Sequence, residues 1–264
     1  MNVIITGNRK GLGLAFTEEF LKFGDNIIIS SRNKQQIEKL ASELKERYPN
    51  QEIFYFVCDV TQEENVLELA KFGKEKFGII HFWINNAGVR ELERAPLMEK
   101  DTSLIIKVLE TNIMGTLYGC KAALNIMIRQ KSGHIFNLEG WGSDGRASPM
   151  SIGYGASKAA IPQLTNTLIT ETKGTGIGIH TISPGMVLTD LILENVELNA
   201  RTIKIFNILA EKPEIVAQSL VPKIRDIKGT GKHIRYLTRK RAMWRFLTAW
   251  KRKNRLIDEK GHLI

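Results

Sequence analysis

Short apolar runs alternate along the chain with longer segments in which apolar residues recur every three or four positions. The runs are rich in isoleucine, valine and phenylalanine, a composition typical of strands that are buried on both faces of a sheet. We predict strands over residues 2–6, 26–31, 52–57, 81–85, 134–138 and 178–182. Strands of this kind need helices to cover both faces of the sheet.

Segments with helical spacing of apolar residues separate these strands. In one of them, Ile37, Leu40 and Leu44 share a face while charged residues occupy the others. The same spacing predicts helices over residues 14–23, 35–48, 63–77, 104–130 and 153–173. Strands that alternate with helices form a parallel sheet. We therefore expect an α/β fold, a Rossmann-type doubly wound parallel sheet flanked by helices, with ligands beyond the carboxyl ends of the strands.

A length of 264 residues suits one domain of this class. We expect a domain over residues 1–237, followed by a basic, tryptophan-containing tail over residues 238–264. The N-terminus lacks the basic and apolar regions of a signal peptide, and no apolar run reaches the roughly 18 residues of a membrane span. We therefore expect a cytoplasmic protein.

Cysteines and histidines are few and scattered. Cys58 and Cys120 do not form a C-x-x-C pair, and no two of the five histidines stand four positions apart. Because a metal site needs a closer pattern of ligands, we expect two buried, reduced thiols and no bound metal.

The positive charge of the chain is concentrated in the tail. The formal net charge is +10, and eight basic residues with no acidic residue among them lie between Leu237 and Leu256. They are Arg239, Lys240, Arg241, Arg245, Lys251, Arg252, Lys253 and Arg255. Since the rest of the chain is close to neutral, we expect no nucleic-acid-binding face across the fold.

Large apolar residues are interleaved with these charges. They are Met243, Trp244, Phe246, Leu247 and Trp250. The mixture predicts a helix within residues 239–255 that contacts a membrane surface, because tryptophan and basic side chains suit the headgroup level. Packing of the helix on its own subunit, or on a partner protein, is the alternative.

A glycine-rich turn follows the first predicted strand and precedes a helix. Its glycines are Gly7, Gly11 and Gly13. Glycine lets the backbone turn tightly and approach a pyrophosphate, while the N-terminus of the following helix favours negative charge. The turn therefore predicts a dinucleotide site.

Four motifs together resemble the short-chain dehydrogenase/reductase family over roughly residues 2–237. They are the G-x-x-x-G-x-G turn, the N-N-A-G sequence at residues 85–88, the Y-x-x-x-K pair Tyr154 and Lys158, and the Pro-Gly at residues 184–185. The resemblance implies a nicotinamide dinucleotide bound by Gly7, Arg9, Lys10, Gly11, Leu12, Gly13, Ser31, Arg32, Asp59, Val60, Asn86, Ala87, Gly88, Tyr154, Lys158, Pro184, Gly185, Val187 and Thr189. It further implies that Asp59 bonds adenine and Thr189 the carboxamide.

The residues after the second strand, Ser31 and Arg32, favour NADP(H) over NAD(H). An NAD-dependent enzyme usually has a carboxylate here for the ribose hydroxyls. A carboxylate would repel a 2′-phosphate, whereas Ser31, Arg32 and the nearby Arg9 and Lys10 can bind it. NADP(H) is the expected cofactor.

Tyr154 and Lys158 are one helical turn apart and share one face of the predicted helix. A cation at about 4 Å lowers a tyrosine pKa by about three units when the effective dielectric constant is about 20, so we expect Tyr154 to act as an acid near neutral pH. In the family, the tyrosine protonates the carbonyl oxygen as hydride arrives, the lysine also binds the nicotinamide ribose, and a helix asparagine supports a proton-relay water. Tyr154, Lys158 and Asn112 match these positions.

The family's carbonyl-polarising serine is where this sequence departs from the pattern. Its place, counted from Asn137, falls at Gly140, and the nearest hydroxyl is that of Ser143 in a glycine-rich loop. Such a loop can bring Ser143 to the carbonyl, which we favour, or it can hold a serine that only bonds backbone. We also expect a kink at Pro162, which lies in the same helix as Tyr154.

Residues 133–137, 183–191, 228–232 and 236–238, with the glycine-rich serine loop, resemble the chlorophyll b reductase branch of the family. Its members reduce the C7 formyl group of chlorophyll(ide) b to hydroxymethyl with NADPH. The resemblance implies reduction of a formyl or keto group of a bulky hydrophobic substrate by a homo-oligomer, a dimer or tetramer. A generic alcohol dehydrogenase or ketone reductase for a soluble metabolite, and a non-catalytic dinucleotide-binding regulatory or scaffold protein, are the alternatives.

Overall fold

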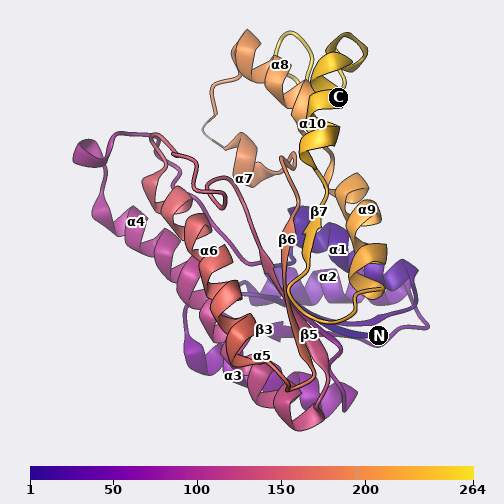
Figure 1. The fold of residues 1–264 in the computed structure, drawn as a ribbon. Coiled ribbons are helices and arrows are strands. Elements are labelled where there is room, and N and C mark those ends of the chain that lie inside the picture. Colours follow the sequence, from indigo (N-terminus) through magenta and orange to yellow (C-terminus); the bar gives the residue numbers. More distant parts are fainter. Residues whose placement is uncertain (195) are drawn as a thin grey trace.

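The computed structural model describes residues 1–194 and 196–264. Parallel strands form one sheet in the order β3–β2–β1–β4–β5–β6–β7, so the strand order reverses between β1 and β4. The strands are β1 (Asn2–Thr6), β2 (Asn26–Ser31), β3 (Ile53–Val57), β4 (Phe82–Asn85), β5 (Gly133–Leu138), β6 (Ile177–Ser183) and β7 (His233–Arg235). The predicted Rossmann-type fold is confirmed (Figure 1).

Helices cover both faces of this sheet (Figure 1). One face carries α1 (Gly11–Lys22), α2 (Lys34–Arg47) and α9 (Pro213–Arg225), and the other carries α3 (Glu63–Phe77), α5 (Gly115–Gln130) and α6 (Ile152–Glu171), with α4 (Thr102–Leu109) packed against α6. The crossover helices therefore bury strands that are apolar on both sides, as the sequence pattern requires.

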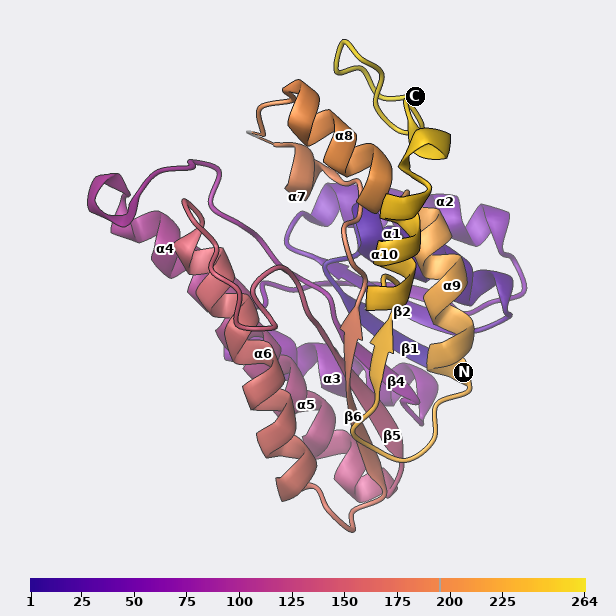
Figure 2. The same cartoon turned by 45° about the horizontal axis from the view of Figure 1, so that its top comes forward.

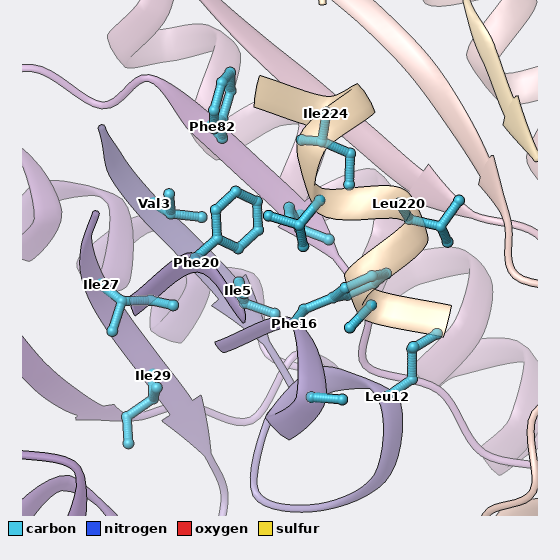
Figure 3. Close-up of a cluster of buried hydrophobic side chains, with 14 of the residues drawn as sticks. Val3, Ile5, Leu12, Phe16, Phe20, Ile27, Ile29, Phe82, Leu220 and Ile224 are labelled. Atoms are coloured by element: carbon cyan, nitrogen blue, oxygen red, sulfur yellow. The ribbon is translucent and has the colours of Figure 1, made fainter. Parts of the chain in front are cut away.

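The core between the sheet and α1 illustrates how these layers are held together (Figure 3). Phe16 and Phe20 of α1 lie between Ile5 of β1 and the α9 residues Leu220 and Ile224, and all five side chains are completely buried. Burial of one such side chain contributes roughly 1.5–3 kcal/mol. This cluster fixes the start of α1, and with it the glycine turn that precedes the helix.

Several elements after β6 have no clear signal in the apolar pattern. They are α7 (Asp190–Leu193), α8 (Ala200–Leu209), α9 and β7. Strand β7 shows the reason, because Ile234 is buried between the exposed residues His233 and Arg235. An alternation with one buried member is too short to be recognised as a strand.

The single helix predicted over residues 104–130 is interrupted. Helix α4 ends at Leu109, a π-helical turn spans Glu110–Met114, and α5 begins at Gly115. A π-helical turn holds one extra residue, which rotates the side chains inside it relative to the helices on either side. Asn112 lies in this turn, and apolar periodicity carries no information about such an insertion.

The tail packs on α8 through apolar contacts. It contains α10 (Arg239–Leu247) and a short 3-10 turn (Ala249–Arg252), and α10 lies beside α8 (Figure 2). Leu256 and Ile257 are buried against Ile203 and Phe206 of α8. None of the helices among the described residues is long and apolar enough to cross a membrane.

Three of the eight basic tail residues point into the protein. The guanidinium groups of Arg245, Arg252 and Arg255 donate to backbone carbonyls at the end of α8, at Leu209, Ile208 and Ala210 respectively. The same three groups surround the carboxylate of Glu211, whose side chain is 5% exposed. These arginines cap the C-terminus of α8, so only part of the tail's positive charge is available to an external surface.

Candidate active site

A large cavity of about 2000 Å³ lies beyond the carboxyl ends of the strands. The arrowheads of β6 and β7 point toward α7, α8 and α10 (Figure 2), and residues of these three helices line the cavity. The turns after β1 and β4, the start of α6 and the loop after β6 all line this cavity. The predicted cofactor and catalytic segments therefore meet in one place, at the end of the sheet where the fold class binds its ligands.

The Tyr154 hydroxyl lies against the backbone of Gly140. A Cβ atom placed on Gly140 would be 2.5 Å from this hydroxyl and 3.1 Å from Cγ of Lys158. Lys158 directs its Nζ to the backbone carbonyl of Leu138 at 3.0 Å and lies 5.9 Å from the centroid of the Tyr154 ring. The two side chains share one face of α6. Gly140, at the position expected for the family's serine, faces both of them and has no side chain.

The expected lowering of the Tyr154 pKa is wrong for this structure. Burial raises the pKa of Tyr154 to about 12, and the charge of Arg90 opposes this rise. Burial also lowers the pKa of Lys158 to about 8, against the influence of the Glu139 carboxylate. A buried site disfavours the charged form of both groups, which the estimate from the lysine charge alone leaves out. Tyr154 therefore holds its proton at neutral pH, as a proton donor must.

Asn112 ties the turn after β4 to the catalytic helix. Its side-chain oxygen accepts from the Val89 N–H at 2.8 Å, and its amide nitrogen donates to the Val89 carbonyl and to Ser157 Oγ, both at 2.9 Å. The π-helical turn described above brings the side chain to this position. Its hydrogen bonds make Asn112 a brace between the N-N-A-G turn and α6.

The Ser143 hydroxyl is engaged with backbone groups. It accepts from the Gly140 N–H at 3.0 Å and donates to the Lys158 carbonyl at 2.9 Å. That carbonyl needs an outside donor, because Pro162, four residues later, has no N–H to offer it. Helix α6 runs from Ile152 to Glu171 and continues through Pro162, so the proline does not end it. These contacts favour the alternative in which Ser143 bonds backbone.

The glycine turn and the N-N-A-G turn pack closely enough to exclude side chains. Gly7 has φ +68°, and a Cβ on it would be 2.7 Å from Cα of Ala87. A Cβ on Gly13 would be 2.5 Å from Nδ2 of Asn86, which itself donates to the carbonyls of Thr6 and Gly7. The cradle at the N-terminus of α1 thus fits a pyrophosphate, for which bare backbone N–H groups are required.

The residues expected around the adenosine end also line the cavity. Ser31 at the end of β2, Arg32 after it, and Asp59 and Val60 after β3 line it together with Arg9. One oxygen of the Asp59 carboxylate accepts from the N–H and the hydroxyl of Thr61 at 3.0 and 2.9 Å. The carboxylate is therefore held in a fixed orientation toward a ligand.

Lys10 is exposed, but its ammonium group already takes part in ion pairs. Its Nζ lies 2.5 Å from Oδ2 of Asp190 and 3.9 Å from Oε1 of Glu194. Asp190 directly follows Thr189, whose Cγ2 would be 3.2 Å from a Cβ on Gly11. The loop after β6, which contains Pro184, Gly185 and Val187, thus reaches across the cavity to the glycine turn.

The family model described as short chain dehydrogenase matches residues 1–199. The chain belongs to the short-chain dehydrogenase family. It is therefore an oxidoreductase of this family, and the family together with NADP-bound structural neighbours supports an NAD(P)(H) cofactor and a small-molecule substrate.

Two rice relatives are chlorophyll(ide) b reductases. The probable chlorophyll(ide) b reductase NYC1, chloroplastic, of Oryza sativa subsp. japonica is 39% identical over 279 residues, covering 100% of this chain and 55% of the relative. The chlorophyll(ide) b reductase NOL, chloroplastic, of the same organism is 40% identical over 246 residues, covering 90% of this chain and 71% of the relative. The chain thus spans about half the length of NYC1, and the resemblance to this branch is confirmed.

Solved structures of short-chain dehydrogenases show the same fold. ElxO with NADP bound has a TM-score of 0.76 at 29% identity, and the match covers 89% of this chain and 96% of that one. The closed form of serine dehydrogenase complexed with NADP+ has a TM-score of 0.77 at 24% identity, covering 90% and 95% of the two chains. The second likeness concerns the fold alone.

Charged residues around this short-chain dehydrogenase site were not predicted from the motifs. Glu91 and Lys100 form a fully buried ion pair at 3.8 Å, and the Glu91 carboxylate accepts from the backbone N–H groups of Gly153 at 2.7 Å and Tyr154 at 3.1 Å. Arg90 lines the cavity. An acidic residue sixty positions before a helix carries no spacing signal for that helix, so only the tertiary structure reveals this cap.

Of the two free cysteines, Cys58 lines the cavity. Cys58 and Cys120 are unbonded and buried, and burial raises the pKa of both thiols to about 12. Across residues 1–194 and 196–264, no group of three or more histidine, cysteine, aspartate or glutamate side chains is arranged to hold a metal ion.

Proposed function

We propose that this short-chain dehydrogenase uses NADPH to reduce a carbonyl group, formyl or keto, of a bulky hydrophobic substrate. The proposed reaction is that of a chlorophyll b reductase, in which the C7 formyl group becomes hydroxymethyl. The observation that carries the proposal is Tyr154, a half-buried phenol that holds its proton at neutral pH at the wall of a cavity of about 2000 Å³. Both chlorophyll(ide) b reductase relatives support the choice of substrate.

The bound cofactor supplies hydride to the carbonyl carbon. Tyr154 transfers its hydroxyl proton to the carbonyl oxygen, so the C=O double bond becomes C–O–H. Lys158 binds the nicotinamide ribose and, as a cation beside the ring, stabilises the phenolate that Tyr154 leaves. Asn112 holds α6 against the N-N-A-G turn, and we assign to it the family's role of supporting a proton-relay water.

We propose NADPH rather than NADH as the reductant. Ser31 and Arg32 lie at the end of β2, where an NAD-dependent enzyme usually has a carboxylate, and Arg9 lines the same cavity. Guanidinium and hydroxyl groups suit a 2′-phosphate through charge-assisted hydrogen bonds. Lys10 can bind the same phosphate when its ion pair with Asp190 is broken.

The substrate end of the cavity supports a large, apolar molecule. Its lining includes Met186, Leu188, Ile192, Phe206 and Phe246, and the exposed Trp141 lies at its edge. A small soluble metabolite would leave most of this surface in contact with water, which costs about 25 cal/mol per Å² of apolar area. This observation favours the bulky substrate over the generic alcohol dehydrogenase.

The proposed reaction is tested by following the absorbance of purified protein with chlorophyllide b and NADPH or NADH. We expect NADPH-specific turnover that a Tyr154→Phe variant loses by a factor of about 10² to 10⁴. Tyr154→Phe keeps the ring and removes only the hydroxyl, so its NADPH affinity serves as the control. Turnover with small soluble ketones alone would support the generic dehydrogenase, and cofactor binding without any turnover would support a regulatory or scaffold protein.

We further propose a peripheral membrane contact through the outer face of the tail. Met243, Trp244, Leu247 and Trp250 are each at least 60% exposed, and Phe246 is 53% exposed while also lining the cavity. The exposed residues Arg239, Lys240, Lys251 and Lys253 flank them. An apolar face with basic residues around it suits an anionic lipid surface, and it places the cavity beside the source of a hydrophobic substrate.

Sedimentation with vesicles tests this contact. We expect binding to vesicles of phosphatidylglycerol and phosphatidylcholine, with loss in a Trp244→Ser/Trp250→Ser variant and at high salt. Binding to neither kind of vesicle, together with tail-dependent association of the protein in solution, would favour a protein partner for the same face. We retain a location in the cytoplasm, at the membrane surface, as part of this proposal.

We also propose a homo-oligomer, a dimer or tetramer, formed through α5 and α6. Leu117 and Ile128 of α5 and Ile152 of α6 are exposed apolar residues, each at least 38% accessible. Apolar side chains on two adjacent long helices suit burial in a symmetric interface. Light scattering on the purified protein tests this assignment, and a Leu117→Glu/Ile128→Glu variant is expected to be monomeric.

A further inference from the structure

The site lacks a side chain at the position where the family polarises the carbonyl group. Gly140 occupies that position, and the Ser143 hydroxyl donates to the Lys158 carbonyl. A carbonyl oxygen that takes up negative charge during hydride transfer still needs a donor beside Tyr154. The guanidinium group of Arg90, two residues after the N-N-A-G turn, is the group best placed to supply it.

We propose that Arg90 binds the carbonyl oxygen of the substrate and stabilises the negative charge that develops there. The proposal rests on the carbonyl reduction proposed above and adds a catalytic residue to it. As hydride reaches the carbonyl carbon, the π electron pair moves onto the oxygen, and Tyr154 then protonates that oxygen. Arg90 contributes hydrogen bonds and charge, and it neither gains nor loses a proton.

Arg90 spans the two walls of the substrate end. Its Nη1 lies 3.5 Å from the carbonyl of Leu191 in α7, and its Nη2 lies 3.4 Å from the hydroxyl of Ser151, the residue before α6. Both distances are at the long limit for a hydrogen bond, so a substrate oxygen can replace either contact at little cost. Since α6 carries Tyr154, the guanidinium group lies along the approach to the reacting hydroxyl.

The guanidinium group has unused hydrogen-bonding capacity. Among the described residues, its Nε is a buried donor without an acceptor, and no carboxylate forms an ion pair with Arg90. The neighbouring Glu91 instead points to the backbone of α6 and to Lys100. A half-buried cation without a counter-ion in a ligand cavity calls for an oxygen ligand that carries negative charge.

The position of Arg90 relative to Tyr154 is fixed through the backbone. The Glu91 carboxylate accepts from the Tyr154 N–H at 3.1 Å, and Lys100 donates to the carbonyls of Glu93 and Met150 at 2.8 and 3.2 Å. Arg90 is adjacent to this buried anchor. Such preorganisation lets a donor act on the transition state without a cost of rearrangement.

Electrostatics agree with this geometry. Burial lowers the pKa of Arg90, and the nearby Arg94 lowers it further, while the charge of Arg90 acts on Tyr154 in the direction of a lower pKa. A guanidinium group nevertheless remains charged over the working pH range. One cation therefore serves both the oxygen that accepts the proton and the phenol that gives it.

The test compares Arg90→Gln with Arg129→Gln, because Arg129 is an exposed arginine of α5 outside the lining of the cavity. With chlorophyllide b and NADPH, we expect Arg90→Gln to lower kcat by a factor of about 10² to 10³, as loss of an oxyanion donor does. Arg129→Gln is expected to keep kcat within a factor of about three. In an Arg90→Ala variant, added guanidinium chloride at low millimolar concentration is expected to restore part of kcat, whereas a purely structural role would give no rescue.

A binding measurement tests Arg90 without turnover. Benzoate carries a charged oxygen next to an aromatic ring and is titrated into the wild-type protein and the Arg90→Gln variant, each saturated with NADP+. We expect benzoate to bind the variant at least tenfold more weakly, with the NADP+ affinity unchanged. Equal benzoate affinities, or equal loss of kcat in both glutamine variants, would overturn the role of Arg90. A wild-type protein that binds benzoate through Arg90 but reduces no carbonyl would instead overturn the proposed function.

Discussion

The hydroxyl of Ser143 donates a 2.9 Å hydrogen bond to the backbone carbonyl of Lys158. In an unbroken α-helix this carbonyl would accept the N–H of residue 162, but that residue is Pro162. A side chain from the preceding loop thus completes the hydrogen bonding of the catalytic helix at the residue that carries the ammonium group. The serine and the proline form one structural unit.

A double-mutant cycle tests this unit. Ser143→Ala leaves the Lys158 carbonyl without its donor and is expected to lower the free energy of unfolding by about 1–2 kcal/mol. Pro162→Ala restores a helical N–H, so in its presence the cost of Ser143→Ala should fall by about 1 kcal/mol. Urea unfolding of the four proteins measures the coupling. Strictly additive effects would contradict this structural unit. A loss of kcat beyond about tenfold in Ser143→Ala would return Ser143 to a catalytic role.

The buried pair Glu91 and Lys100 predicts a large effect on stability at a position next to Tyr154. Glu91→Gln leaves the Lys100 ammonium buried without a counter-charge and weakens the cap on the Tyr154 N–H, at a cost of about 3 kcal/mol. Chemical denaturation measures this cost. Glu93→Gln changes an exposed carboxylate two residues away and is expected to stay within about 0.5 kcal/mol.

A second variant separates the effect of Glu91 on stability from its effect on the position of Tyr154. In Glu91→Gln/Lys100→Met, no unpaired charge remains, so much of the lost stability should return while the alignment of Tyr154 stays impaired. Recovery of stability together with full kcat would show that Glu91 does not position the tyrosine.

The pH dependence of the proposed carbonyl reduction follows from the pKa values of Tyr154 and Lys158. Lys158 is charged below its pKa of about 8, and Tyr154 is protonated below about 12. Because the reaction needs both in these forms, kcat should be level below about pH 7.5 and fall up to tenfold per pH unit above about 8. Rates at saturating NADPH measure the profile, and a level profile up to pH 10 would contradict it.

The ion pair between Lys10 and Asp190 holds one cation away from the cofactor. Asp190→Asn removes a negative charge near the expected 2′-phosphate and leaves Lys10 to bind it. Since both side chains are at least half exposed, the effect is small, and we expect the Kd of NADPH to fall about threefold. Fluorescence titration measures this change, and NADH serves as the control because it has no 2′-phosphate. Glu194→Gln, at the longer distance of 3.9 Å, should change less.

The arginines of the tail predict that the tail supports the substrate end. Arg245→Met removes donors to the Leu209 carbonyl and to Glu211, so we expect a loss of about 3 kcal/mol where the buried carboxylate keeps fewer partners. The matched variant is Lys240→Met, an exposed cation on the same helix. Thermal unfolding and limited proteolysis of α8 compare the two. Equal stability of both variants would mean that the tail can be dispensed with.

The sheet and the cofactor end can be predicted from the sequence, because the patterns that indicate them are local. Apolar runs give the strands, and the spacing of Gly7, Gly11 and Gly13 gives the turn. The spacing of Tyr154 and Lys158 likewise placed both on one face of α6. The pKa of Tyr154 was missed, since burial is a property of the whole fold and an estimate from one neighbouring charge omits it.

The contacts of Arg90 and Glu91 could not be predicted in this way. Glu91 meets Tyr154 across 63 residues of sequence, and no motif relates two such positions. The interruption at Asn112 and the inward turn of Arg245 have the same cause, because each depends on what another segment of the chain presents. Local patterns define the elements, whereas the chemistry between elements requires the tertiary structure.

The apolar residues around α8 form a cluster of their own, separate from the two clusters on either side of the sheet. Ile203, Phe206 and Ala210 pack with Leu256 and Ile257 of the tail, while the sheet and its helices bury different side chains. Mutations in this third cluster can therefore accumulate without loosening the nucleotide-binding framework. The proposed substrate end thus has a packing unit of its own, in which Phe206 both lines the cavity and belongs to the third cluster.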